Sequence, residues 1–195
     1  MYLSNKNLVM ENVLIWNLPS GVTCPGKTSM CDKHCYAKKA ERFCPHVLEC
    51  RYENLRDSKS PKFVENMIAA IRGKVVKNKN FNGHFRIHES GDFYSQKYLD
   101  DWMEIASAFP KIKFLAYTKS FHLSFNSQVD NVEIVMSVWP DTKMGDIPKW
   151  APKSYVGIED DLAVKCLMGK LKCNRCNFKC WRLSKLKKNV CIEMH

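Results

Sequence analysis

Acidic residues are missing from a long stretch near the end of this 195-residue chain, since none occurs between residues 162 and 192. The same stretch carries nine of the 31 lysines and arginines, so the rest of the chain is nearly neutral, with 22 basic against 20 acidic residues. Such a basic segment is typical either of a nucleic-acid-binding surface or of the surroundings of a buried negative charge.

Long apolar runs are also missing. No run of 18 apolar residues exists, which argues against a membrane span, and the first 17 residues lack the apolar core and small-residue cleavage site of a secretion signal. We therefore expect a cytoplasmic protein. A hydrophobic share of 45% excludes wholesale disorder, but 195 residues are too few for a complete eight-fold β/α barrel, which takes about 250.

Cysteine is absent from the 115 residues between Cys50 and Cys166, and the ten cysteines divide equally between the two ends of the chain. In a chain without an export signal, cysteines are more often metal ligands or reactive thiols than disulfide partners. The sequence thus places two cysteine-rich ends around a cysteine-free middle.

The first cysteine set is Cys24, Cys31 and Cys35, with the spacing C-x6-C-x3-C. It begins with Thr-Cys-Pro-Gly, which predicts a loop. Three thiolates on one loop can hold three irons of a 4Fe–4S cluster and leave the fourth iron open to a ligand. Zinc is the alternative, with His34 or Cys44 as a fourth ligand, and the spacing alone does not decide between the two metals.

The second cysteine set comprises four residues with the spacing C-x6-C-x2-C-x3-C, directly before Trp181; they are Cys166, Cys173, Cys176 and Cys180. Four cysteines so close together indicate a zinc site or a second 4Fe–4S cluster. A four-thiolate cluster carries a net charge of about −2, so the surrounding lysines could offset it instead of binding nucleic acid. Of the remaining cysteines, Cys44 and Cys50 are expected to be ordinary thiols and Cys191 a reserve ligand.

Hydrophobic patterning predicts strands at residues 8–16, 83–87, 112–117, 132–138 and 154–158. It predicts helices directly after Cys35, from Ser60-Pro61 to Gly73, and through Tyr98, Trp102, Ile105 and Ala106 up to Pro110. Residues 120–131 could be helix or loop. This alternation predicts an α/β protein with a parallel sheet, open or partly curled into a barrel. We expect a core at residues 1–160 and a cysteine-rich segment at residues 161–195.

Several motifs together resemble the phage "gene product eighty-eight" family, which is itself similar to radical S-adenosylmethionine proteins. They occur in order along nearly the whole chain: Cys24-Pro-Gly, Cys31, Cys35-Tyr-Ala, Phe-Arg-Ile-His-Glu-Ser-Gly-Asp-Phe at 85–93, Tyr-Thr-Lys-Ser at 117–120, and the late cysteines with Trp181. The cysteine spacing differs from the usual C-x3-C-x2-C of radical S-adenosylmethionine proteins, and His34 stands where those carry an aromatic residue.

The resemblance implies a reduced partial β/α barrel with S-adenosylmethionine on the open iron of the first cluster and an auxiliary 4Fe–4S cluster in a small C-terminal module. It also implies an external low-potential electron donor of the flavodoxin or ferredoxin type, in the cytoplasm of a bacterial or phage host cell. The reaction would be reductive cleavage of S-adenosylmethionine to modify a substrate that the sequence does not identify. No catalytic residue beyond the cofactor sites can be named from the sequence.

The cofactor-binding residues implied by the resemblance lie mainly in the loop at 88–92. Glu89 or Asp92 would accept hydrogen bonds from the ammonium or ribose, and Gly91 would allow close backbone approach. The complete set is Tyr36, Arg86, Glu89, Ser90, Gly91, Asp92 and Lys119, with Tyr36 against adenine and Lys119 or Arg86 at the carboxylate. Without the resemblance, the same loop would be a plain turn in which Ser90 or Asp92 caps the next helix.

Three functions therefore stay open from the sequence. The first is the radical S-adenosylmethionine enzyme with two clusters. The second is a zinc- or cluster-containing protein that binds nucleic acid, or another acidic macromolecule, through its basic segment. The third is a cluster protein for electron transfer or sensing.

Overall fold

A computed structural model describes residues 1–5, 7–167 and 170–194. Its centre is an eight-stranded sheet in the order β1-β2-β3-β4-β5-β6-β8-β7, in which only the β1–β2 pair is antiparallel. The strands are β1 (Leu3–Ser4), β2 (Leu14–Trp16), β3 (His84–Ile87), β4 (Lys113–Thr118), β5 (Val132–Val138), β6 (Lys153–Val156), β7 (Val164–Cys166) and β8 (Val190–Ile192). The predicted α/β class with a mostly parallel sheet is confirmed.

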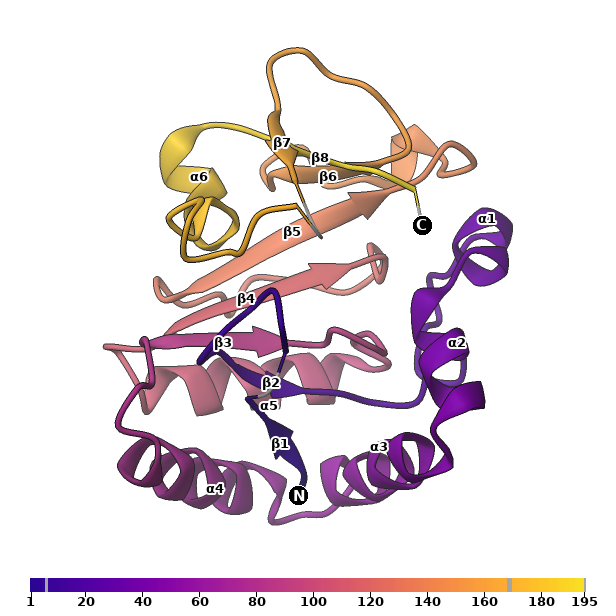
Figure 1. Cartoon of the computed structure of the whole chain (residues 1–195). Helices are drawn as coiled ribbons and strands as arrows, with labels where there is room; N and C mark the ends of the chain where they lie inside the picture. Colours follow the sequence, from indigo (N-terminus) through magenta and orange to yellow (C-terminus); the bar gives the residue numbers. More distant parts are fainter. Residues whose placement is uncertain (6, 168–169, 195) are drawn as a thin grey trace.

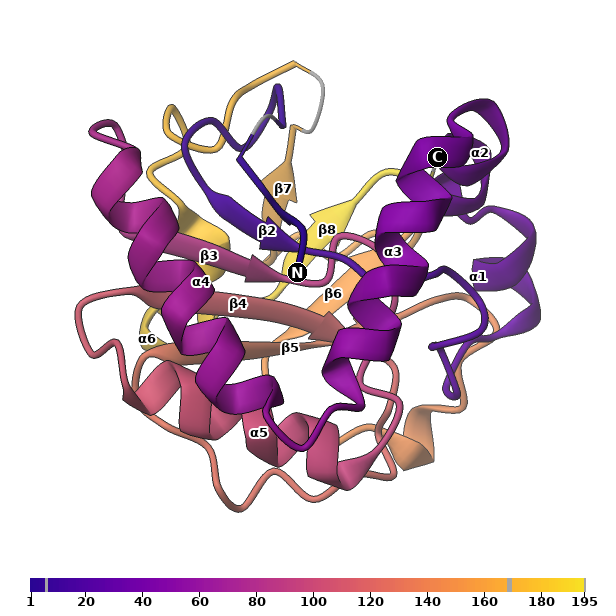
Figure 2. The same cartoon turned by 90° about the horizontal axis from the view of Figure 1, so that it is seen from below.

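Most of the helices lie on one face of this sheet or beyond the carboxyl ends of its strands, whereas the short helix and 3₁₀ turn of the C-terminal segment lie on the other face (Figures 1 and 2). The helices are α1 (Ser29–Lys33), α2 (Tyr36–Phe43), α3 (Pro45–Ser58), α4 (Phe63–Lys77), α5 (Gln96–Ser107) and α6 (Leu183–Leu186), with 3₁₀ turns η1 (Met144–Asp146) and η2 (Lys179–Arg182). The hydroxyl of Ser95 caps α5 by accepting from the amide of Tyr98, and Trp102 is fully buried beneath the helix, as the apolar spacing predicts.

Alternate residues of the central strands enter two separate cores. On β3, Phe85 and Ile87 pack with the helices, whereas the ring of His84 stacks on Phe178 on the other face, with centroids 4.0 Å apart. That second face is covered by the C-terminal segment, and Trp181 donates a 3.2 Å hydrogen bond to the carbonyl of Phe85. Because both faces are covered, β2, β4 and β5 are buried along nearly their whole length.

Three predicted boundaries are wrong. The strand expected at 8–16 is limited to β2, because the side-chain oxygen of Asn7 accepts from the amides of Val9 and Met10 and bends the chain. The helix expected from Ser60 starts at Phe63 and continues through Gly73 to Lys77. The loop expected around Cys31 contains the short α1, whose cap is the hydroxyl of Thr28.

The last part of the chain contributes β7 and β8, which extend the sheet at one edge. Helix α3 and strand β1 had not been predicted, and residues 120–131 contain no helix. In the described residues, no helix combines the length and apolar character needed to cross a membrane.

Candidate functional site

The loops that follow β2 and β3 are bound to each other at the carboxyl ends of the strands. The amide of Leu18 donates to the carbonyl of Ser90 at 2.9 Å, and the Ser90 hydroxyl donates back to the carbonyl of Leu18 at 2.9 Å. The side-chain oxygen of Asn17 accepts from the amides of Glu89 and Ser90. The loop that carries the first cysteine set is therefore fixed to the loop at 88–92.

Gly91 is required where these loops meet. Its φ is +88°, and a Cβ atom there would lie 2.7 Å from Cβ of Leu18 and 2.8 Å from Oγ1 of Thr23. Both the left-handed backbone and the lack of space exclude a larger residue. Gly91 thus allows the two loops to lie in close contact.

Asp92 joins this pair of loops to the end of β4. Its buried carboxylate accepts from the hydroxyl of Thr118 at 2.6 Å, the amide of Lys119 at 2.9 Å and the amide of Phe93 at 2.7 Å. Burial raises the pKa of Asp92, and these donors oppose the rise. Asp92 does not cap α5, because Ser95 does.

The three thiols of the first cysteine set are half-buried and lie within electrostatic reach of one another. Burial, and then the charge of Asp92, raise the pKa of Cys24 to about 11, with Cys31 adding to the rise. Burial also raises the pKa of Cys31, whereas the charge of Lys119 and its hydrogen bond to the thiol lower it. The structure therefore brings together Cys24, Cys31, Cys35, Asp92 and Lys119.

Tyr36 and Glu89 connect α2 to the same site. The hydroxyl of Tyr36 donates to the carbonyl of Glu89, while 41% of the Tyr36 residue surface stays exposed. Burial of the hydroxyl raises the pKa of Tyr36. The carboxylate of Glu89 accepts from Nδ2 of Asn7 at 2.6 Å, so one of its oxygens is already bonded within the protein.

Two acidic residues that the sequence did not single out hold the first cysteine loop in place. Glu41 accepts from the amide and the hydroxyl of Ser20, at 2.8 and 2.5 Å, and pairs with Arg51 at 2.7 Å. Asp141 accepts from the amide of Met30 at the start of α1, at 2.8 Å. The only sequence signal for Asp141 was its place directly after a strand and Trp-Pro, where ligand-binding loops begin.

The second cysteine set lies on the other face of the sheet, against the core around Trp181. Cys166, Cys173 and Cys180 pack on this core, and the thiol of Cys176 donates to the carbonyl of Cys173 at 3.2 Å. Burial raises the pKa of Cys173 to about 12 and that of Cys180 to about 11, and charges on the neighbouring thiols add to both rises. The structure thus brings the four predicted ligands into one region.

Arg86, predicted to meet the cofactor carboxylate, lies between the two cysteine sets. Its Nε donates to the carbonyl of His88 at 2.9 Å, and its guanidinium carbon stands 4.1 Å from the ring centroid of Tyr117. Burial raises the pKa of Tyr36 near the first set and of Cys180 in the second, and the charge of Arg86 opposes both rises. Arg86 therefore acts on both regions, whereas Lys119 acts on Cys24 and Cys31 of the first set.

The remaining cysteines occupy different surroundings. Cys44 is exposed, and the thiol of Cys50 lies 3.6 Å from Nε2 of His46 on α3. Cys191 lies on β8, with its thiol 3.7 Å from the carbonyl of Asp160. Across residues 1–5, 7–167 and 170–194, no three His, Cys, Asp or Glu side chains converge closely enough to hold a single metal ion.

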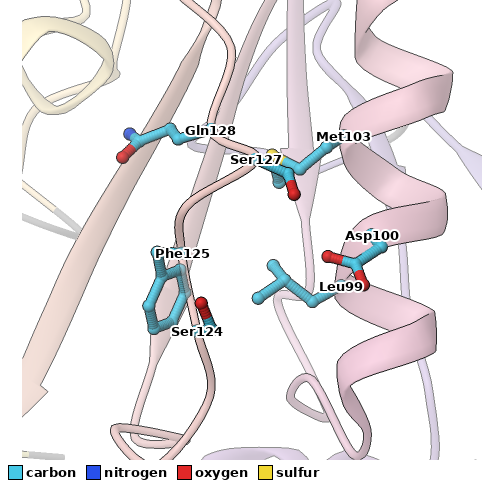
Figure 3. A pocket seen from close by; sticks show the side chains of 7 residues that line it. All are labelled: Leu99, Asp100, Met103, Ser124, Phe125, Ser127 and Gln128. Carbon is cyan, nitrogen blue, oxygen red and sulfur yellow. The ribbon is translucent and has the colours of Figure 1, made fainter.

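A small hollow on the helix-covered face does not belong to this site. It lies between α5 and the loop at 124–128, and Figure 3 shows the side chains of Leu99, Phe125 and their neighbours around it. None of the predicted site residues lines it. The chemistry-bearing residues are concentrated instead at the strand ends and on the second face.

The fold and the site together define a mixed α/β protein in which a mostly parallel sheet carries one cysteine set at its strand ends and another on one face. A family model described as "Gene product 88" matches residues 3–189. The chain belongs to this phage gene product 88 family, as its motifs indicated.

Two curated relatives are phage proteins. The "Gene 88 protein" of Mycobacterium phage D29 is 32% identical over 139 residues, which is 60% of this chain and 58% of the relative. The "Gene 88 protein" of Mycobacterium phage L5 is 33% identical over 135 residues, 64% of this chain and 56% of the relative. The chain thus spans somewhat over half the length of these relatives, and no solved structure matches it.

Proposed function

We propose that the chain is a radical S-adenosylmethionine-like iron–sulfur enzyme that binds a 4Fe–4S cluster and S-adenosylmethionine at the first cysteine set. The observation that carries the proposal is the meeting of Cys24, Cys31 and Cys35 with Asp92 and Lys119 at the carboxyl ends of parallel strands. Ligands of parallel β/α sheets bind at this edge.

The donor set fits such a cluster. Burial raises the pKa of Cys24 and Cys31, and the charge of a neighbouring thiol adds to each rise, so these thiols favour a positively charged partner that displaces their protons. Four ligands about 2.3 Å from one tetrahedral zinc stand about 3.8 Å apart, whereas a cubane cluster binds each thiolate on a different iron and accepts wider spacing.

The arrangement of the sheet also supports the proposal. The parallel strands β2 to β6 lie side by side in chain order, and α3, α4 and α5 all cover the same face (Figure 2). A sheet wound in one direction, with its helices on one side, is the arrangement that curls into a partial barrel. The second cysteine set would then lie on the inner face and hold the auxiliary cluster.

Each residue of the site has a task in this proposal. A reduced cluster with bound S-adenosylmethionine would supply one electron for cleavage of a sulfonium carbon–sulfur bond, and the electron would come from an external flavodoxin- or ferredoxin-type donor.

Lys119 would pair with the cofactor carboxylate, and the Glu89 oxygen that is not bonded to Asn7 would accept from the cofactor's ammonium or ribose. Tyr36 would cover the adenine with its exposed ring, held by the bond to Glu89.

Asp92 and Gly91 would act indirectly in this scheme. Asp92 holds the amide of Lys119 and the hydroxyl of Thr118, and so fixes the end of β4 against the cysteine loop. Gly91 keeps the two loops in contact. Ser90 has its hydroxyl bonded to Leu18, so we assign it to the loop contact and not to the cofactor.

A metal count on anaerobically purified full-length protein tests the proposal. We expect about seven to eight irons with matching sulfide per chain, and a loss of about four irons in each of Cys24→Ala, Cys31→Ala and Cys35→Ala. The control is Cys44→Ala, which removes an exposed thiol outside both sets and should keep all the iron.

The alternative functions give other results. One or two zincs per chain without sulfide would overturn the proposal and favour the nucleic-acid-binding alternative, and loss of zinc in Cys44→Ala would identify Cys44 as its fourth ligand. Full iron loading without cleavage of S-adenosylmethionine would instead favour an electron-transfer or sensing protein.

A further inference from the structure

The amino ends of the central strands form an edge of the sheet opposite the candidate site. His84 and Lys113, the first residues of β3 and β4, are register partners there. The C-terminal segment reaches the same edge, because the ring of Phe178 stacks on His84 and the amide of Ser184 on α6 donates to Glu133, the second residue of β5, at 2.8 Å. Figure 1 shows α6 at the edge from which β4 and β5 start.

Exposed basic side chains from separate parts of the chain lie along this edge. Two lie at the start of β4, two flank Phe178, one lies on α6 and two precede β8. This set, which we call the basic edge, consists of Lys111, Lys113, Arg175, Lys179, Lys185, Lys187 and Lys188. Within the part of the chain that the structure describes, none of the seven forms an ion pair with a carboxylate.

Few acidic side chains oppose this charge. Asp130 is exposed before β5, whereas Glu133 is buried and bonded to Ser184. Glu11 is already paired with Lys172. The surface therefore carries a strong excess of positive charge that solvent reaches directly.

The part of the basic edge that comes from the C-terminal segment is held in a fixed conformation. The amide of Cys173 donates to the carbonyl of Val9 at 3.0 Å, and Trp181 donates to the carbonyl of Phe85 at 3.2 Å. Leu183 is fully buried beneath α6. Because this backbone is already ordered, an anion that binds there pays little of the usual cost of ordering a loop.

We propose that the basic edge is a docking surface for the phosphate backbone of a nucleic acid. The strands β3, β4, β5, β6 and β8 are neighbours, so at about 4.8 Å a strand the edge is about 19 Å wide. A duplex carries one negative charge per about 1.7 Å of its axis, so several phosphates fit across this width. The surface is separate from the first cysteine set, and its role does not depend on the proposed enzyme activity.

An anionic membrane suits this surface less well. Binding in a membrane interface needs an amphipathic helix with an apolar face free to insert. Helix α6 has four residues and buries its Leu183 in the protein, and Phe178 and Trp181 also pack on the sheet. The exposed groups here are chiefly charged, as a phosphate-binding surface requires.

The test compares two quadruple variants of the anaerobically purified full-length chain, without reductant or S-adenosylmethionine. The first replaces Lys111, Lys113, Lys185 and Lys188 by Gln. The matched control replaces four equally exposed residues of α3 and α4 by Gln, namely Lys59, Lys62, Arg72 and Lys74. Both lower the formal net charge from +11 to +7. Fluorescence anisotropy with labelled duplex DNA and single-stranded RNA of random sequence, at several salt concentrations, measures the affinity.

We expect the parent to bind at least one of the two probes and the basic-edge variant to bind at least about tenfold more weakly, with a salt slope smaller by about 3 to 4. The control should stay within about twofold of the parent. If the quadruple variant does not fold, the pairs Lys111→Gln/Lys113→Gln and Lys185→Gln/Lys188→Gln are compared separately, each expected to lower the slope by about 2.

Three results would overturn the proposal: no binding of either probe by the parent, equal losses in the two quadruple variants, or binding to phosphatidylserine vesicles alone. None of them bears on the cleavage of S-adenosylmethionine, which is measured separately. Conversely, a chain that does not cleave S-adenosylmethionine but loses nucleic acid only in the basic-edge variant would support the docking surface and count against the enzyme.

Discussion

The backbone of Gly26 presses against the backbone of Lys119: a Cβ atom at residue 26 would lie 2.0 Å from the carbonyl oxygen of Lys119. Residue 26 belongs to the loop of the first cysteine set, and Lys119 follows β4. Two segments far apart in the sequence are thus in direct contact at the site. The Pro-Gly after Cys24 is therefore needed for this contact as well as for the turn.

The first prediction concerns this contact. Gly26→Ala should lower the free energy of unfolding by about 1–3 kcal/mol, because backbone atoms on both sides must move apart, and should reduce iron at the first set. The matched control is Gly73→Ala in α4, where the added Cβ meets no atom within 4 Å and should stabilise the protein by about 0.5–1 kcal/mol. Denaturant unfolding of the two variants measures both effects; equal stability of Gly26→Ala and the parent would contradict the contact.

The second prediction concerns the buried ion pair that anchors α2. Arg51 and Glu41 are 2.7 Å apart, with side chains only 8% and 11% exposed. Arg51→Met should cost about 3 kcal/mol, since it leaves a buried carboxylate without its cation. Arg56→Met removes an exposed partner of Glu53, 3.7 Å away, and should change stability by less than about 0.5 kcal/mol. Equal losses of stability in the two variants would show that burial of the Arg51–Glu41 pair does not increase the cost of removing its cation.

The third prediction concerns the loss of folding stability at acid pH through the buried His88. Burial, and then the charge of Arg86, lower the pKa of His88 to about 3. The folded chain therefore keeps His88 neutral while the unfolded chain protonates it below pH 6.5, so stability is lost as pH falls from about 6.5 toward 3. Between pH 6.5 and 5.5 this amounts to ~1 kcal/mol.

The raised pKa values of Asp92 and Glu133 act in the opposite direction, so a variant is needed to isolate the histidine. His88→Asn suits the left-handed backbone of residue 88, where φ is +61°, and should lose this acid sensitivity. His46→Asn, at a side chain that is 81% exposed, should keep it. Urea unfolding at both pH values makes the comparison, and equal pH dependence in parent and His88→Asn would contradict it.

Local patterns predicted much of the fold. The spacing of Tyr98 and Trp102 identifies α5 because a buried helix face repeats every three to four residues. Helix α3 escaped prediction because few of its residues are apolar, and its buried face includes Arg51 and Asn54. Strand β1 could not be predicted because it has only two residues and forms by pairing with β2, which lies further along the chain.

The candidate site was predictable in its residue types and less so in its arrangement. Cysteine spacing identified both sets, because short gaps bring thiols together whatever the fold. Arg86 contacts Tyr117 on the face of the sheet that carries the second set. This placement depends on which face of β3 Arg86 occupies and on where the C-terminal segment packs. A strand alternates faces with a period of two, but the sequence does not say which loop covers each face.

The central claim is tested most directly by the cleavage of S-adenosylmethionine. The iron-loaded, anaerobic chain is reduced with dithionite, incubated with S-adenosylmethionine, and its products are analysed by mass spectrometry. We expect 5′-deoxyadenosine or methylthioadenosine from the parent and from Cys44→Ala, and none from Cys24→Ala, Cys31→Ala or Cys35→Ala. No cleavage product from a fully loaded, reduced parent, or undiminished cleavage in all three variants, would contradict it.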